Sequence, residues 1–184
     1  MRGLCIRGSW ADRPARLAGG GRALGGAGLL LPATARALGA KHQVWLDSMV
    51  PDGRCSLLSE LREVATEIVN PEWLGVDPID DHQAAVRFLF HDCPPSTQSW
   101  ALTTLRRFIP NYAYAHPISL VEEIPSTYVA CSLDRTLKPW WCADVAARRL
   151  GVHAAVLDTG HCPHVSDPDG VARILTAVMG APRR

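Results

Sequence analysis

The sequence predicts an α/β fold in which parallel strands are flanked by helices. Residues 128–131 and 153–157 are short apolar runs of the kind found in buried strands. Between them, residues 139–150 carry apolar side chains at helical spacing, and Gly151 follows, a usual residue just past the end of a helix. A helix that connects two such strands crosses over the sheet, so the two strands should lie parallel.

The other elements are predicted from their local patterns. Residues rich in Ala, Leu and Gly, up to Gly39, favour a helix, which Pro32 should kink. Residues 44–47 read as a strand that ends in a turn, and residues 57–69, 83–90 and 96–108 read as helices. Asp167 is an expected N-cap. The apolar residues that follow it predict a closing helix that covers the sheet: Val171, Ile174, Leu175 and Val178.

Two residues with catalytic potential follow the strands of the strand–helix–strand unit. Asp134 comes after the first strand and His161 after the second. Each alone has an ordinary explanation, since aspartate is common in turns and histidine serves many structural roles. The carboxyl ends of adjacent parallel strands meet at one edge of a sheet, where open α/β sheets hold their sites. The sequence therefore predicts that His161 acts as a general base and that Asp134 fixes its tautomer.

These residues also carry a family resemblance. The pattern V-x-C-x-x-D-x-x-x-x-P runs from Val129 through Asp134 to Pro139, and Gly160-His161 follows the last strand. Both resemble the α/β-hydrolase family, in particular its short-cap esterase and hydroxynitrile-lyase branch, where the acid precedes the histidine. The resemblance covers residues 19–184. It implies a partial α/β-hydrolase sheet with a helical cap at about 51–125, and cofactor-free hydrolysis of small esters.

The glycine-rich loop that begins at Gly19 departs from the family pattern. Against G-x-S-x-G the chain reads Gly21-Arg22-Ala23-Leu24-Gly25, so Ala23 occupies the position of the nucleophile and the N–H of Leu24 that of an oxyanion donor. A methyl group cannot attack a carbonyl carbon. We therefore expect an inactive or impaired enzyme, which is N-terminally truncated and lacks part of the oxyanion hole, with residues 1–18 as a poorly ordered tail.

The same loop leaves other functions open. It misses the dinucleotide pattern G-x-G-x-x-G by one residue, and Asp47 ends the next strand, where a ribose-binding acid could lie. A dinucleotide-dependent reductase using residues 19–26 is thus one alternative. Another is a ligand-binding or scaffold protein that keeps the hydrolase pocket without its nucleophile. A third is a linker without chemistry. By the family resemblance, Asp47 is instead structural or near the pocket mouth.

Two further clusters are weaker candidates. Cys93 follows His91 and Asp92, but adjacent side chains on one loop do not readily face one another as a catalytic set. The run His161-Cys162-Pro163-His164 could suggest zinc, but its ligands are too close to wrap one ion and no second pair stands at finger spacing. We therefore predict neither a metal nor a cofactor.

Composition limits the partners and the compartment. The chain has 184 residues, 47% of them hydrophobic, and a net charge of +1, which gives no bulk attraction to nucleic acid or to an anionic membrane. No apolar run reaches the roughly 18 residues that a membrane span needs. The six scattered cysteines indicate free thiols in a reducing compartment, so we expect a cytoplasmic protein. Its expected partners are a small-molecule ligand or ester substrate and, through an exposed sheet edge, a second copy.

Overall fold

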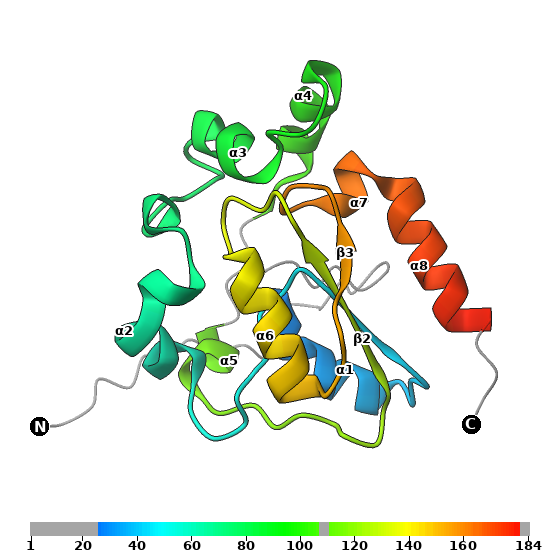
Figure 1. Ribbon diagram of the computed structural model, residues 1–184. Coiled ribbons are helices and arrows are strands. Elements are labelled where there is room, and N and C mark those ends of the chain that lie inside the picture. Colours follow the sequence, from blue (N-terminus) through cyan, green and yellow to red (C-terminus); the bar gives the residue numbers. More distant parts are fainter. Residues whose placement is uncertain (1–25, 107–110, 181–184) are drawn as a thin grey trace, which may run out of the picture.

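The computed structural model describes residues 26–106 and 111–180, which form an α/β fold around a parallel sheet (Figure 1). The strands are β1 (Gln43–Leu46), β2 (Ser126–Cys131) and β3 (Ala155–Leu157), in the order β1-β2-β3. Both pairings are parallel, with Gln43 opposite Ser126 and Val129 opposite Ala155. The predicted α/β fold with a parallel sheet and flanking helices is therefore confirmed.

The crossover between β2 and β3 is helix α6 (Pro139–Leu150), with the bounds that the sequence predicts. Its buried face includes Trp141 and Val145, which pack against the sheet. The helix ends at Gly151, whose φ of +67° is left-handed and whose N–H donates back into the last turn. This strand–helix–strand unit places the loops that follow β2 and β3 at the same edge of the sheet.

The first described elements are a 3₁₀ turn, η1 (Gly26–Leu30), and helix α1 (Leu31–Ala37). The predicted kink at Pro32 is wrong, because Pro32 lies in the first turn of α1. Backbone N–H groups in the first turn make no hydrogen bond within the helix, so a proline there breaks none. Upstream, a Cβ on Gly28 would lie 2.2 Å from the backbone oxygen of Met49. The small size of Gly28 thus allows η1 to pack against the loop that follows β1.

The segment between β1 and β2, residues 47–125, is called here the β1–β2 insertion. It holds short helices: α2 (Leu57–Ile68), η2 (Pro71–Trp73), α3 (His82–Leu89), α4 (Pro95–Thr104) and α5 (Asn111–Ala115). The three helices predicted here are all present, but the third ends at Thr104 instead of residue 108, because Leu105 adopts ψ 140°. Figure 1 shows that α3 and α4 lie beyond the carboxyl ends of the strands.

After β3 the chain forms α7 (Pro163–Ser166) and α8 (Pro168–Gly180). Asp167 accepts the N–H of Gly170 at 2.9 Å, as expected for a residue before a helix. Helix α8 buries little of its apolar face: Gly170 is its one fully buried residue, and Leu175 is 41% exposed. The period of its apolar residues predicts the helix but not how far that face is buried.

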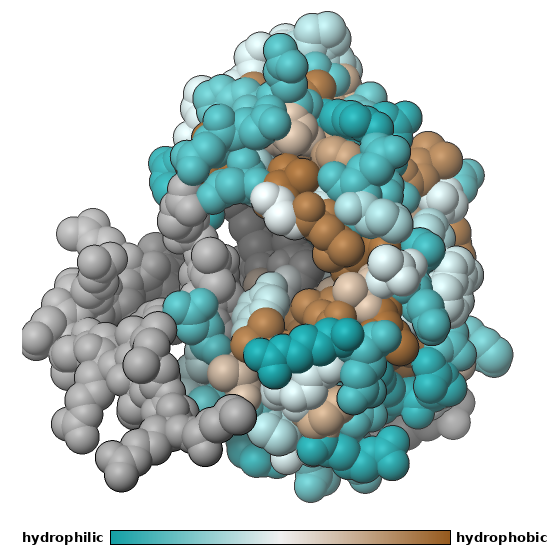
Figure 2. All heavy atoms as spheres, turned by 90° about the vertical axis from the view of Figure 1, so that its left-hand side faces the viewer, coloured by the Kyte–Doolittle hydropathy of each residue, from teal (hydrophilic) through white to brown (hydrophobic). Residues whose placement is uncertain are grey.

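The buried apolar side chains form two clusters. The larger lies between the sheet and the helices around it and includes Trp45, Tyr128 and Val145. The smaller contains Leu89, Phe90, Cys93, Ala101 and Cys162, and so joins the β1–β2 insertion to the loop after β3. Figure 2 shows a hollow bordered by hydrophobic side chains below the helices at the top of the molecule. In the described part of the chain, no helix has the length and apolar character to cross a membrane.

Candidate functional site

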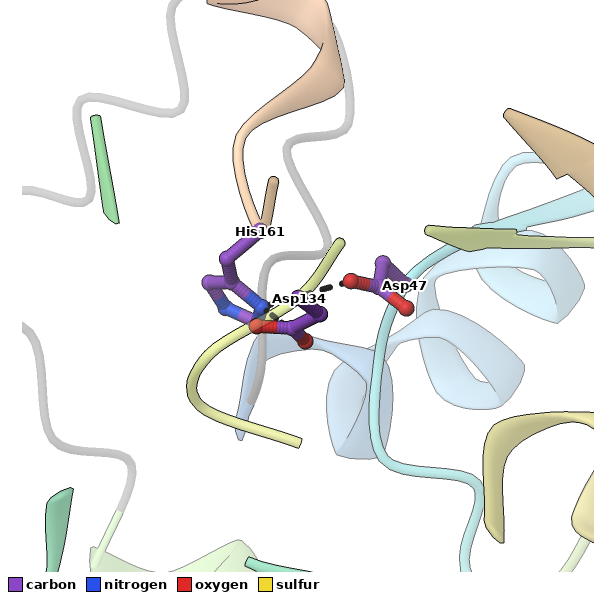
Figure 3. Close-up of side chains that lie close together, drawn as sticks. All are labelled: Asp47, Asp134 and His161. Atoms are coloured by element: carbon purple, nitrogen blue, oxygen red, sulfur yellow. Dashed lines mark hydrogen bonds and ion pairs between the residues drawn. The ribbon is translucent and has the colours of Figure 1, made fainter. Parts of the chain in front are cut away.

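Asp134 and His161 meet at the carboxyl edge of the sheet. Their loops run side by side, since Ser132 N–H donates to Leu157 O at 2.9 Å and Leu133 N–H to Thr159 O at 3.0 Å. His161 Nδ1 lies 2.9 Å from Asp134 Oδ2, and both side chains are buried (Figure 3). The contact that the sequence predicts is therefore present in the structure.

A tight turn holds the Asp134 carboxylate in place. It accepts the backbone N–H groups of Thr136 at 2.6 Å and Leu137 at 3.1 Å. The Thr136 hydroxyl lies 3.0 Å from Asp134 Oδ1 and 2.8 Å from His161 Nδ1, so it contacts both members of the pair. Sequence reasoning missed Thr136, because a threonine two residues after an aspartate is an ordinary turn residue.

Asp47 is a third member of the site. It follows β1, is completely buried, and has a φ of +43°, which is unusual outside glycine. Its Oδ1 accepts the N–H of Cys131 at 3.3 Å, and its Oδ2 lies 3.4 Å from His161 Nδ1. The sequence did not connect Asp47 with His161, although it ends the strand beside the one that leads to Asp134.

The three groups shift one another's protonation. Burial opposes the charge on His161, but the neighbouring Asp134 carboxylate outweighs it and raises the pKa of His161 to about 10. Burial would raise the pKa of Asp134, yet the charge and hydrogen bond of His161 lower it to about 2. For Asp47 burial dominates and raises the pKa to about 7. The shifts favour the charged forms of His161 and Asp134 and the neutral form of Asp47.

The positions predicted for the nucleophile and the oxyanion donor, Ala23 and Leu24, lie outside the described residues. Cys93, the other candidate, is described and is buried. Burial, followed by the charge of Asp92, raises the pKa of Cys93 to about 11, which opposes formation of a thiolate nucleophile.

A metal centre is not needed to explain the buried charges. Ligand atoms of Asp47, Asp134 and His161 lie within 4.8 Å of one another, and no other such group occurs among residues 26–106 and 111–180. However, His161 Nδ1 already lies within hydrogen-bonding distance of Asp134, and backbone N–H groups hold the Asp134 oxygens. The buried charges are thus balanced by the ion pair and by hydrogen bonds.

Comparison with known proteins agrees with this fold. Residues 8–174 match the model of the alpha/beta hydrolase family. The crystal structure of polyneuridine aldehyde esterase is similar, with a TM-score of 0.67 and 16% sequence identity over 85% of this chain and 69% of that one. The search of curated proteins gives no match. Because the family match spans most of its length, this chain belongs to the alpha/beta hydrolase family.

Proposed function

We propose that the site is built for carboxylesterase-type hydrolysis of small esters, with His161 as the proton-transfer group and Asp134 as its partner. The observation that carries the proposal is the 2.9 Å contact between His161 Nδ1 and Asp134 Oδ2 at the carboxyl edge of the sheet. With Nδ1 engaged, Nε2 is the ring atom left for proton transfer. Within the described part of the chain, no hydrogen bond occupies Nε2.

Activity of the chain as it stands should be weak or absent. Ala23 has no hydroxyl to form an acyl-enzyme, and loss of the serine in a serine hydrolase costs about 10⁶-fold in kcat. In addition, a histidine with a pKa near 10 carries a proton at neutral pH and cannot accept another. General-base action of His161 on water should therefore increase towards alkaline pH.

A non-catalytic ligand-binding function is the second candidate, and Ala23 favours it. A hydrolase without its nucleophile can still hold a small ester in a pocket, with the β1–β2 insertion as its cap. The dinucleotide alternative is less well supported, because Asp47 is fully buried next to His161 and a ribose would have to break that arrangement. We also propose a cytoplasmic location, which the free cysteines Cys93 and Cys131 support.

Release of p-nitrophenol from p-nitrophenyl acetate separates the two functions. We expect little or no activity from the natural chain and a gain in Ala23→Ser that His161→Ala then abolishes. Ala23→Val, which adds volume but no hydroxyl, is the matched control at that position. His153→Ala removes a histidine outside the site and should leave the gained activity intact. If Ala23→Ser stays inactive while the ester still quenches tryptophan fluorescence, the binding function is favoured and the hydrolase proposal fails.

A further inference from the structure

Two residues of the β1–β2 insertion contact both loops of the candidate site. They lie between α3 and α4, in the sequence His91-Asp92. His91 Nε2 lies 3.0 Å from the backbone oxygen of Leu133, and because a carbonyl only accepts, Nε2 must carry the proton. The Asp92 carboxylate accepts the N–H of Gly160 at 2.6 Å. One dipeptide therefore links the loop after β2 to the loop after β3.

The points of contact are adjacent to the pair itself. Leu133 directly precedes Asp134, and Gly160 directly precedes His161. A change in the separation of Leu133 and Gly160 therefore shifts the backbone from which the side chains of Asp134 and His161 reach one another across 2.9 Å. The hydrogen bond from Leu133 N–H to Thr159 O also connects the two loops directly. It does not involve Gly160 N–H, which donates to Asp92.

The absence of a side chain at Gly160 is what permits this approach. A Cβ at that position would lie 2.8 Å from His91 Nε2 and 2.9 Å from Asp92 Oδ1, closer than real Cβ atoms come to other atoms. Gly160 is itself buried, and its neighbour Cys162 packs with Cys93 in the smaller apolar cluster. The backbone of the histidine loop is thus pressed against His91 and Asp92, with apolar packing beside the hydrogen bonds.

We propose that His91 and Asp92 are positioning residues, which hold the loops of Asp134 and His161 at the separation that their hydrogen bond requires. The proposal rests on the function proposed above for its role in catalysis. The positioning of the two loops itself can be tested whether or not the protein turns over a substrate. The β1–β2 insertion would then have two functions. It would cover a ligand, and its turn between α3 and α4 would hold His161 in position for proton transfer.

Proton NMR of labelled protein tests the proposal directly. The readouts are the downfield signal of the His161 Nδ1 proton, which requires its hydrogen bond to Asp134, and the hydrogen-exchange protection of the Gly160 amide. In Asp92→Ala we expect loss of the Gly160 protection and loss or broadening of the Nδ1 signal. Asp92→Asn keeps an amide oxygen that can accept from Gly160, so both signals should be largely retained.

Asp81→Ala is the matched control, because Asp81 lies in the same insertion and caps α3 through the N–H of Ala84 at 2.9 Å without touching either loop. It should leave both signals unchanged. Unchanged signals in Asp92→Ala overturn the proposal. If Asp92→Ala does not fold, His91→Ala is used instead, because it removes the hydrogen bond to the Leu133 carbonyl. This variant must weaken the His161 Nδ1 signal, and an unaltered signal overturns the proposal.

Kinetics distinguish this proposal from the proposed function. In an Ala23→Ser background that has gained esterase activity, Asp92→Ala should lower kcat by about 10- to 100-fold with a smaller change in KM, as expected from misplacing a reacting group by about 1 Å. If Ala23→Ser gains no activity but Asp92→Ala still removes the two NMR signals, the hydrolase function fails and the positioning role holds. If activity appears and Asp92→Ala alters neither kcat nor the signals, the positioning role fails and the function holds.

Discussion

Replacing Asp47 by asparagine should stabilise the protein at alkaline pH and have little effect in acid. The folded protein holds the proton of Asp47 up to a pKa of about 7, whereas an unfolded chain loses it near 3.8. Folding stability therefore falls as the pH rises from 3.8 to about 7. The difference of roughly 3 pKa units corresponds to about 4 kcal/mol. Asparagine removes this penalty, since its neutral side chain resembles the protonated carboxyl group and can still accept from Cys131 N–H through Oδ1.

Urea unfolding followed by tryptophan fluorescence at pH 4 and pH 8 measures the effect, because Trp45 lies buried in β1, two residues before Asp47. We expect Asp47→Asn to gain up to about 4 kcal/mol relative to the natural chain at pH 8 and only about 0.5 kcal/mol at pH 4. Asp144→Asn is the control: it loses an exposed pair with Arg148 and should change stability slightly, in the opposite direction. Equal effects of Asp47→Asn at both pH values, or a loss at pH 8, would refute the assignment of Asp47 as a buried carboxyl with a raised pKa.

Three other substitutions test separate parts of the structure. Asp134→Asn should lower the free energy of unfolding by about 2 kcal/mol at pH 7, because the pKa of Asp134 is lowered from 3.8 to about 2. In urea titrations this loss should disappear as the pH falls through that range. A loss that is constant with pH contradicts the ion pair. Thr136→Val keeps the shape of a buried side chain but removes its hydroxyl from Asp134 and His161, so urea unfolding should show a loss of about 1–3 kcal/mol; an unchanged stability contradicts the bond to a charged group. Gly28→Ala places a Cβ 2.2 Å from Met49 O and should lower the stability by about 1–3 kcal/mol in thermal unfolding. An unchanged stability contradicts the close packing of η1 against the loop after β1.

The elements that the sequence predicts best are those with a local signature. The unit from β2 to β3 is of this kind: its two apolar runs, the helical spacing of residues 139–150 and Gly151 each have one simple explanation, and together they require parallel strands. The meeting of Asp134 and His161 follows from that topology, since both come directly after neighbouring strands. Helix ends within the β1–β2 insertion were less predictable, because the extended residue Leu105 ends α4 without proline or glycine at that position.

The rest of the site depends on contacts between segments that no local pattern links. Asp47 lies more than a hundred positions before His161, and its role becomes visible only when β1 is known to pair with β2. Thr136 is an ordinary turn residue until its hydroxyl is placed between Asp134 and His161. In the sequence, His91 and Asp92 stand out only as neighbours of Cys93, whereas their contacts are with Leu133 and Gly160. Such assignments require the tertiary structure.

The spacing along the chain also has a consequence for the order of folding. Strands β2 and β3 are joined by a short crossover, whereas β1 must close a loop of about eighty residues to reach β2. Loop closure costs entropy, and local pairings form sooner than distant ones. We expect the imidazole–carboxylate contact to assemble early, with the strand that carries Asp47 docking afterwards. In a mutational analysis of the folding transition state, substitutions in α6 should slow refolding, and substitutions in β1 should mainly accelerate unfolding.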